Sequence, residues 1–258
     1  MTDRNRIKQA FGDYTDRYDP SDIKIRLKID HTYRVAENAE RIAENIGLDE
    51  RGIFLAFAMG MLHDFGRFEQ VKRYGTFIDR KSIDHAELGA DLLFRDGFIR
   101  DFFDEEDLDQ DTADLIEKVI RLHNKLALPE GLTDNEIQFC NLIRDADKID
   151  IFRVLAEVEY EDGRAGETKS TADGARDSIM QCVREHRCVP RIGDRSEFEV
   201  WVSRYCMAFE LVFPISRRLA KEQGYLAQIL GRRPQSPAQQ EQMDLIRKEL
   251  EYYLRDKR

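Results

Sequence analysis

The sequence predicts an all-α protein, because three observations agree. Apolar residues recur at the three- and four-residue spacing of amphipathic helices along most of the 258 residues. Capping residues precede several of these apolar stripes, and Gly or Pro follows them. Alternating Val, Ile and Thr between paired glycine turns, which would indicate strands, is hard to find. We therefore expect a helical bundle with additional helices at its C-terminal end.

Most helix boundaries in the first 160 residues are marked by a capping residue or by glycine. Ser21 or Asp22 can cap the first helix, which Gly47 ends, and the next helix is apolar on all sides and should be buried. The first expected elements are a loosely organised N-terminal extension (1–20), helices over 21–46 and 53–62, and a polar basic loop (68–81). After them we expect a helix that begins with the capping box Asp84 and Glu87, an acidic turn-rich loop with a short helical piece (95–111), a helix that begins at Thr112, and a long helix that begins with the capping box Thr133 and Glu136.

The C-terminal hundred residues carry similar helix signals but no motif that indicates a function. The expected elements are an exposed, mobile loop (161–174), a helix near 179–184, a long aromatic helix (198–223) with a capping box at Ser196 and Glu199 and a kink at Pro214, and a last amphipathic helix after Ser236 and Pro237. The aromatic helix is expected to pack in the core or in a homodimer interface. We therefore divide the chain into an extension (1–20), a metal-binding core (21–160) and a helical extension (161–258) that packs on the core within one structural domain.

The composition argues against several classes of partner. The formal net charge is −10 and 36% of the residues are charged, so the surface should repel nucleic acid polymers and anionic membranes. A phosphate-bearing substrate would then need a local basic pocket or metal ions. The four cysteines form no CxxC pair, and the first residues do not resemble a signal peptide. We expect a reduced, cytoplasmic protein without a membrane span.

Four of the five histidines lie in the first half of the chain, each on or at the end of an apolar helical stripe. Two aspartates, Asp64 and Asp147, occupy similar positions. An ionised carboxylate buried on an apolar face costs several kcal/mol unless a strong partner, such as a metal ion, neutralises it. The fifth histidine, His186, lies in a charged stretch and is expected at the surface. The predicted metal ligands are His31, His63, Asp64, His85, His123 and Asp147.

Mixed imidazole and carboxylate donors indicate a transition metal, namely iron, manganese, nickel, cobalt or zinc. A catalytic ion keeps open positions for water and substrate, so six ligands are more than one ion needs. Two ions about 3.5–4 Å apart would use all six, and Asp64 could bridge them. We therefore expect one or two ions and favour two, with a hydroxide between them as the nucleophile and no attack by a protein side chain.

The order of these residues resembles the H…HD…D pattern of the HD superfamily of metal-dependent phosphohydrolases. The match consists of His31, the pair His63-Asp64 and Asp147, and it covers about residues 24–156. The resemblance implies an all-helical HD-domain bundle with the metal site at its centre. Two further segments are similar to the extra histidine motifs of the two-metal members, Asp84-His85-Ala86-Glu87-Leu88-Gly89 and Leu122-His123-Asn124.

The resemblance also implies roles for residues near the metal ligands. It makes Asp147 the final ligand, rather than Asp145 or Asp150, because the family places a basic residue directly after this ligand and Lys148 follows Asp147 here. Lys148 and Arg67 are implied to point towards substrate phosphate, and we count them with Asp64 as catalytic residues. The basic loop offers further candidate substrate contacts, Arg73, Arg80 and Lys81.

Two specialised substrates are not favoured. The nucleotide cyclic-diester phosphodiesterases of the superfamily usually carry paired histidines and a Gly-Tyr-Pro segment, but Asn124 follows His123 here and no such segment occurs. The (p)ppGpp hydrolases carry acidic residues soon after the HD pair, where this chain has Phe65-Gly66-Arg67-Phe68. We expect a phosphohydrolase for a phosphomonoester or phosphoanhydride of a small, nucleotide-type substrate. The alternatives are a di-iron oxygenase of the same superfamily and a metal-binding regulatory module without catalysis.

Overall fold

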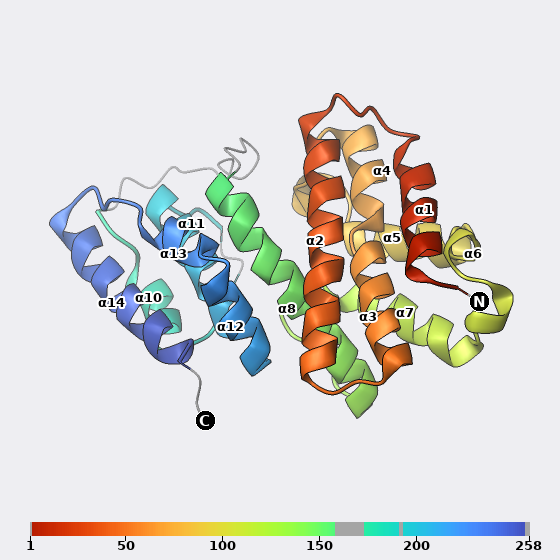
Figure 1. Ribbon diagram of the computed structural model, residues 1–258. Helices are drawn as coiled ribbons and strands as arrows, with labels where there is room; N and C mark the ends of the chain where they lie inside the picture. The colour runs from red at the N-terminus through yellow and green to blue at the C-terminus, as the bar shows by residue number, and fades with distance from the viewer. Residues whose placement is uncertain (1, 158–172, 191–192, 256–258) are drawn as a thin grey trace. The chain divides into compact units, whose positions relative to one another are not determined.

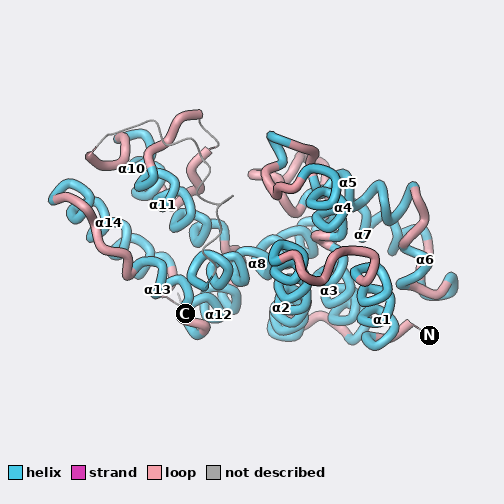
Figure 2. Tube along the Cα trace, turned by 90° about the horizontal axis from the view of Figure 1, so that it is seen from above, coloured by secondary structure: helices cyan, strands magenta, loops and turns pink. Residues whose placement is uncertain are grey.

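The computed structural model describes residues 2–157, 173–190 and 193–255, and it confirms the all-α prediction. These residues form helices joined by loops and contain no strand (Figure 2). The chain divides into two compact units, residues 1–150 and residues 151–258. The packing of the C-terminal part on the core within one domain therefore stays a prediction.

The first unit contains the predicted bundle. Helix α2 packs along α3, α1 lies against α3, and α4 packs against α5 (Figure 1). Its helices are α1 (Arg4–Thr15), α2 (Ile23–Asn45), α3 (Glu50–Leu62), α4 (Phe65–Tyr74), α5 (His85–Ala90), α6 (Ile99–Phe102), α7 (Gln110–Leu122) and the long α8 (Asp134–Glu157), which continues into the second unit. Short 3-10 turns lie at Asp79–Lys81 and Glu105–Asp107, and a π-helical turn, Asp91–Arg95, follows α5.

Glycines allow two pairs of helices in this unit to approach each other closely. A Cβ added to Gly60 on α3 would lie 2.6 Å from the Cα atom of Ala36 on α2, so these two backbones touch. A Cβ on Gly66 of α4 would overlap the carbonyl oxygen of His85 and lie 2.6 Å from the amide nitrogen of Gly89, both on α5. Helices α2 and α3, and α4 and α5, are therefore fixed to each other by direct backbone packing.

The expectation of a loosely organised extension over residues 1–20 is wrong. Residues 4–15 form α1, whose apolar side buries Ile7, Phe11 and Tyr14. The Tyr14 ring stacks on Phe65 at a centroid distance of 3.7 Å, and its hydroxyl donates to the Phe65 carbonyl oxygen at 3.1 Å. The polar composition of the segment concealed this stripe of large side chains, which α4 covers.

The basic loop expected over residues 68–81 is also largely helical. Its first part belongs to α4, because Phe65, Phe68 and Val71 recur at helical spacing and are all buried. Gly75, with φ of 66°, ends the helix in the left-handed conformation. Two of the predicted substrate contacts, Arg80 and Lys81, lie in the following 3-10 turn.

The capping predictions are partly confirmed. Asp84 caps α5 through the amide nitrogen of Ala86 at 3.0 Å, but Glu87 pairs with Arg121 instead of returning the bond. Helix α7 begins before Thr112, because the Asp109 side chain accepts from the Thr112 amide at 2.8 Å and acts as the cap. Both reciprocal bonds are present in the capping boxes Thr133 with Glu136 and Ser196 with Glu199.

The second unit lacks the long kinked helix predicted over 198–223. Phe213 is extended, with ψ of 140°, because a residue before proline avoids the helical region. Pro214 therefore begins a new helix rather than bending an old one. The helices are α10 (Asp177–Arg184), α11 (Glu197–Tyr205), α12 (Pro214–Glu222), α13 (Tyr225–Leu230), which was not predicted, and α14 (Pro237–Tyr253), with a 3-10 turn at Cys206–Glu210. The loop predicted over 161–174 lies mostly outside the described residues.

Among the described residues, no helix is both long enough and apolar enough to cross a membrane. All four cysteines are free thiols, of which Cys188 is half-buried and the others are buried.

Candidate metal centre

The predicted metal ligands come together inside the first unit. Helix α2 carries one of them, the ends of α3 and α7 carry three, the start of α5 carries one, and the middle of α8 carries the last. Five side chains are at most 4% exposed, and the Asp147 side chain is 16% exposed. The six residues are His31, His63, Asp64, His85, His123 and Asp147.

The six side chains form two groups of three. In each group one donor atom per residue lies within 4.8 Å of the other two. The first group is His31, His63 and Asp147, and the second is Asp64, His85 and His123.

Asp64 faces both groups. Its Oδ2 atom lies 3.5 Å from Nε2 of His31 and 3.5 Å from Nε2 of His63. Its Oδ1 atom lies 3.3 Å from Nε2 of His85 and 3.7 Å from Nε2 of His123. One carboxylate therefore presents one oxygen to each pair of imidazoles, which is the arrangement expected of a bridging ligand.

Each imidazole is oriented by a bond at its other nitrogen. The Nδ1 atoms of His63 and His123 lie 2.7 Å from the carbonyl oxygens of Gly60 and Ile120, respectively. A carbonyl oxygen only accepts, so both Nδ1 atoms carry a proton, and Nε2 is the nitrogen through which each ring could bind a metal ion.

Carboxylates orient the remaining two imidazoles. Nδ1 of His31 lies 2.7 Å from Asp150, and Nδ1 of His85 lies 2.8 Å from Asp79. Metal-binding histidines are usually held in this way by carboxylates or backbone carbonyls. All four Nε2 atoms are thereby directed towards the cluster.

Two of these nitrogens are buried beside a carboxylate oxygen. Nε2 of His31 and Nε2 of His63 are inaccessible to solvent and lie 3.1 and 3.7 Å from Oδ1 of Asp147, but they form no hydrogen bond with a described residue. Nε2 of His85 lies 3.1 Å from Nε2 of His123. Burial and the nearby Arg67 lower the pKa of His85 to about 3, so this ring is neutral at pH 7. These two nitrogens face each other, and a cation held by both rings would stabilise this arrangement.

The carboxylates of the cluster are ionised. Burial alone would raise the pKa of Asp64, but the positive charge of Lys28 and the facing histidines hold it well below its usual value. Burial likewise opposes ionisation of Asp147, but the facing imidazoles of His31 and His63 hold its pKa well below its usual value. Burial opposes the charged form of His31, but the carboxylates of Asp147 and Asp150 raise its pKa above the usual value. Imidazoles and ionised carboxylates are the donors that divalent transition-metal ions require, and a metal ion would take the place of any imidazole proton at Nε2, so the residues fit such ions.

A third group of possible metal ligands lies next to the cluster, but its residues are better explained as holding α5 in place. Asp79, Asp84 and His85 also lie within reach of a common point. However, Nδ1 of His85 is already bonded to Asp79, and the oxygens of Asp84 accept from the Ala86 amide, Asn124 and Lys125. These bonds hold the start of α5 in place.

Three residues near the cluster were not among the predicted site residues. Asp79 and Asp150 orient imidazoles, and the ammonium group of Lys28 lies 2.5 Å from Oδ2 of Asp64. Lys28 precedes His31 by one turn of α2, which is a signal that sequence reasoning could have used. Asp79 carries no such signal, because a turn of the chain brings it to His85.

The predicted substrate contacts lie at different distances from the cluster. Arg67 is next to it, with Nε 3.5 Å from Oδ1 of Asp64. Lys148 is buried, and its ammonium group lies 3.4 Å from the Arg144 carbonyl oxygen. The other three are exposed, and none of them bonds to a cluster residue that the structure describes. They are Arg73, which pairs with Glu69, and Arg80 and Lys81.

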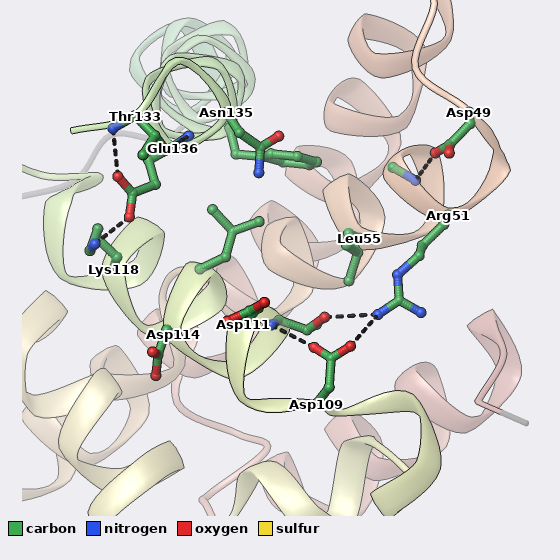
Figure 3. Close-up of a pocket in the computed structure, with 14 residues that line it drawn as sticks. Asp49, Arg51, Leu55, Asp109, Asp111, Asp114, Lys118, Thr133, Asn135 and Glu136 are labelled. Carbon is green, nitrogen blue, oxygen red and sulfur yellow. Dashed lines mark hydrogen bonds and ion pairs between the residues drawn. The ribbon is translucent and has the colours of Figure 1, made fainter.

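A large surface cavity lies elsewhere in this unit. Its volume is about 510 Å³, and it is formed by the N-terminal parts of α3, α7 and α8 (Figure 3). Its charged side chains include the pairs Arg51 with Asp109 and Lys118 with Glu136. None of the six predicted ligands lines this cavity, so it is not part of the metal centre.

Replacing Asp150 or Asp79 by Asn tests the orienting bonds. We expect each variant to lower metal affinity by about 10- to 100-fold, because the amide keeps the shape but loses the charge that strengthens the imidazole donor. Equilibrium dialysis with Mn²⁺ or Co²⁺ measures this affinity. Asp101, an exposed carboxylate of the same unit, supplies the control, and Asp101→Asn should leave the affinity unchanged. Wild-type affinity in both test variants would exclude the orienting role.

The unit is therefore an all-helical domain with a buried cluster of four imidazoles and two carboxylates that could hold metal ions. Residues 29–151 match the family model of the HD domain. This match supports membership in the HD superfamily, whose members are mostly metal-dependent phosphohydrolases. Comparisons with curated proteins and with solved structures found no match.

Proposed function

We propose that this protein is a divalent-metal-dependent phosphohydrolase that cleaves a phosphomonoester or phosphoanhydride of a small, nucleotide-type substrate. The position of Asp64 carries the proposal, because its two oxygens face two separate pairs of imidazoles within an HD domain. Two groups of three donors support two ions rather than one. When bound, such ions activate water at neutral pH and neutralise charge on phosphoryl oxygens.

Substrate would approach from the side where the cluster is open to solvent. The side chains of Asp147, Lys28 and Arg67 are 15–16% exposed, whereas the imidazoles are at most 4% exposed. Two of these three side chains are cationic. An anionic group that enters on this side therefore meets positive charge before it reaches the histidines.

Hydrogen bonds fix the guanidinium group of Arg67 in an orientation that suits binding of an anion. One guanidinium nitrogen donates to Gln70, to the Phe77 carbonyl oxygen and to Asp79, at 2.7–3.0 Å. Its Nε atom is buried and forms no hydrogen bond with a described residue. We assign this N–H to a phosphoryl oxygen of the substrate, since a hydrogen bond to an ionised group is stronger than one to a neutral group. Lys148 stays a proposed second contact.

The proposal is tested with protein reconstituted separately with Mn²⁺, Fe²⁺, Co²⁺, Ni²⁺ or Zn²⁺. Phosphate release is measured from a panel of nucleoside mono-, di- and triphosphates and simple phosphomonoesters. We expect release that depends on metal and falls at least tenfold in Arg67→Met with metal content unchanged.

Two results would contradict the phosphohydrolase. One is the absence of phosphate release with every metal although the protein binds two equivalents of it. The other is oxygen consumption by the iron form without phosphate release, which would indicate an oxygenase.

A further inference from the structure

The C-terminal unit contains a small pocket that the proposed function does not use. Its volume is about 80 Å³, which is room for two or three waters at about 30 Å³ each and is comparable with one tetrahedral oxyanion. The first turns of α11 and α14 line it through Glu197, Phe198 and Gln239, together with the loop after α13. Helix N-termini carry partial positive charge, which favours an anion between them.

Arginines surround the indole ring that lines this pocket. The guanidinium carbon of Arg232 lies 3.4 Å from the ring centroid of Trp201, and that of Arg204 lies 4.5 Å from it. A guanidinium stacked on an aromatic ring keeps its N–H edge available for two parallel hydrogen bonds. The stack therefore holds Arg232 in a fixed orientation at the edge of the pocket.

Several arginine side chains lie close together at this pocket. Burial and the nearby charges of Arg232 and Arg195 lower the pKa of Arg204 to about 10, which reflects repulsion among these groups. Arg232 and Arg233 both line the pocket and are exposed, and neither forms an ion pair with a residue that the structure describes. The acidic side chain in the lining is that of Glu197, which is exposed.

We propose that Arg232, Arg233 and Trp201 form a binding site for a phosphate group in the C-terminal unit. The guanidinium groups would donate paired hydrogen bonds to the phosphate oxygens, and the bound dianion would offset the repulsion among the arginines. The site lies on residues other than the metal centre and does not depend on the proposed reaction.

Trp201 is the single tryptophan of the chain and lines the pocket, so tryptophan fluorescence can report binding there. The full-length protein is titrated with inorganic phosphate at constant ionic strength, with chloride as the reference anion, and tryptophan fluorescence is measured. We expect a saturable change with phosphate and none with chloride. A second titration with AMP distinguishes free phosphate from the phosphate group of a larger molecule, which would bind more tightly.

Variants separate this site from the metal centre and from general surface charge. Arg232→Gln and Arg233→Gln should weaken phosphate binding at least tenfold, as measured by fluorescence and by calorimetry. Arg184→Gln removes an exposed arginine of α10 outside the pocket and should change nothing. Asp64→Asn, which alters the metal centre, should leave the fluorescence titration unchanged. Loss of the signal in Asp64→Asn, or equal affinity in the Arg232 and Arg184 variants, would overturn the proposal.

Discussion

Replacing Asp64 by Asn is expected to abolish activity and to release metal from both groups of ligands. The amide has a single acceptor oxygen and no charge, whereas the carboxylate faces His31 and His63 with one oxygen and His85 and His123 with the other. Metal ions contribute several kcal/mol of transition-state stabilisation. Since about 1.4 kcal/mol corresponds to a factor of ten, we expect a loss of about a thousandfold or more in kcat/KM.

Metal content per protein and phosphate release are measured on the same samples. Asp101→Asn is the matched control, because it makes the same chemical change at an exposed position of the same unit. Circular dichroism verifies that Asp64→Asn remains helical. If the variant retained two equivalents of metal with unchanged affinity, Asp64 would not bridge the groups.

Replacing Gly66 by Ala is expected to lower the free energy of unfolding more than any other substitution proposed here. The new Cβ would overlap the His85 carbonyl oxygen and lie 2.6 Å from the Gly89 amide nitrogen, and these backbone atoms cannot move aside without separating α4 from α5. Overpacking costs about 1–3 kcal/mol where side chains can adjust, so we expect at least about 3 kcal/mol here. Asp64 lies directly before α4 and His85 begins α5, so metal affinity should fall as well.

Urea denaturation of metal-free protein measures the change in free energy of unfolding. Gly12→Ala is the control, since Gly12 lies within α1 and an added Cβ meets nothing within 4 Å. The better helix propensity of alanine should make this variant as stable as the wild type or up to about 1 kcal/mol more stable. Equal stability of the Gly66 and Gly12 variants would show that α4 and α5 are not in backbone contact.

The six predicted ligands could be identified from the sequence because each lies on or beside a local pattern. His31 and Asp147 interrupt apolar helical stripes, and the His63-Asp64 pair ends a helix that is apolar on all sides. The structure brings all six together. Residue type and helical spacing indicated the cluster, because a buried imidazole or carboxylate on an apolar stripe requires a partner. The resemblance to the HD superfamily was needed to select Asp147 over Asp145 and Asp150.

The residues that were missed depend on contacts between distant segments. Asp79 reaches His85 through a 3-10 turn, and Phe11 and Tyr14 are buried by rings from distant segments, Phe68 and Phe65 of α4 among them. Pro214 was placed inside a helix because the aromatic spacing continues through it, although its missing amide proton suits the first turn of a new helix better. Such features follow from tertiary packing and are not visible as a periodic pattern.

The two groups of ligands have the same pattern of hydrogen bonds at their imidazoles. In each group, one histidine is bonded to a carboxylate (His31 or His85) and the other to a carbonyl oxygen of its own helix (His63 or His123). Asp147 belongs to only one of the two groups. The group that contains His85 and His123 therefore has less negative charge, so we expect an ion bound there to exchange more readily with the surrounding solution. The metal supply of the cell would then set how much of the protein carries both ions at a given moment.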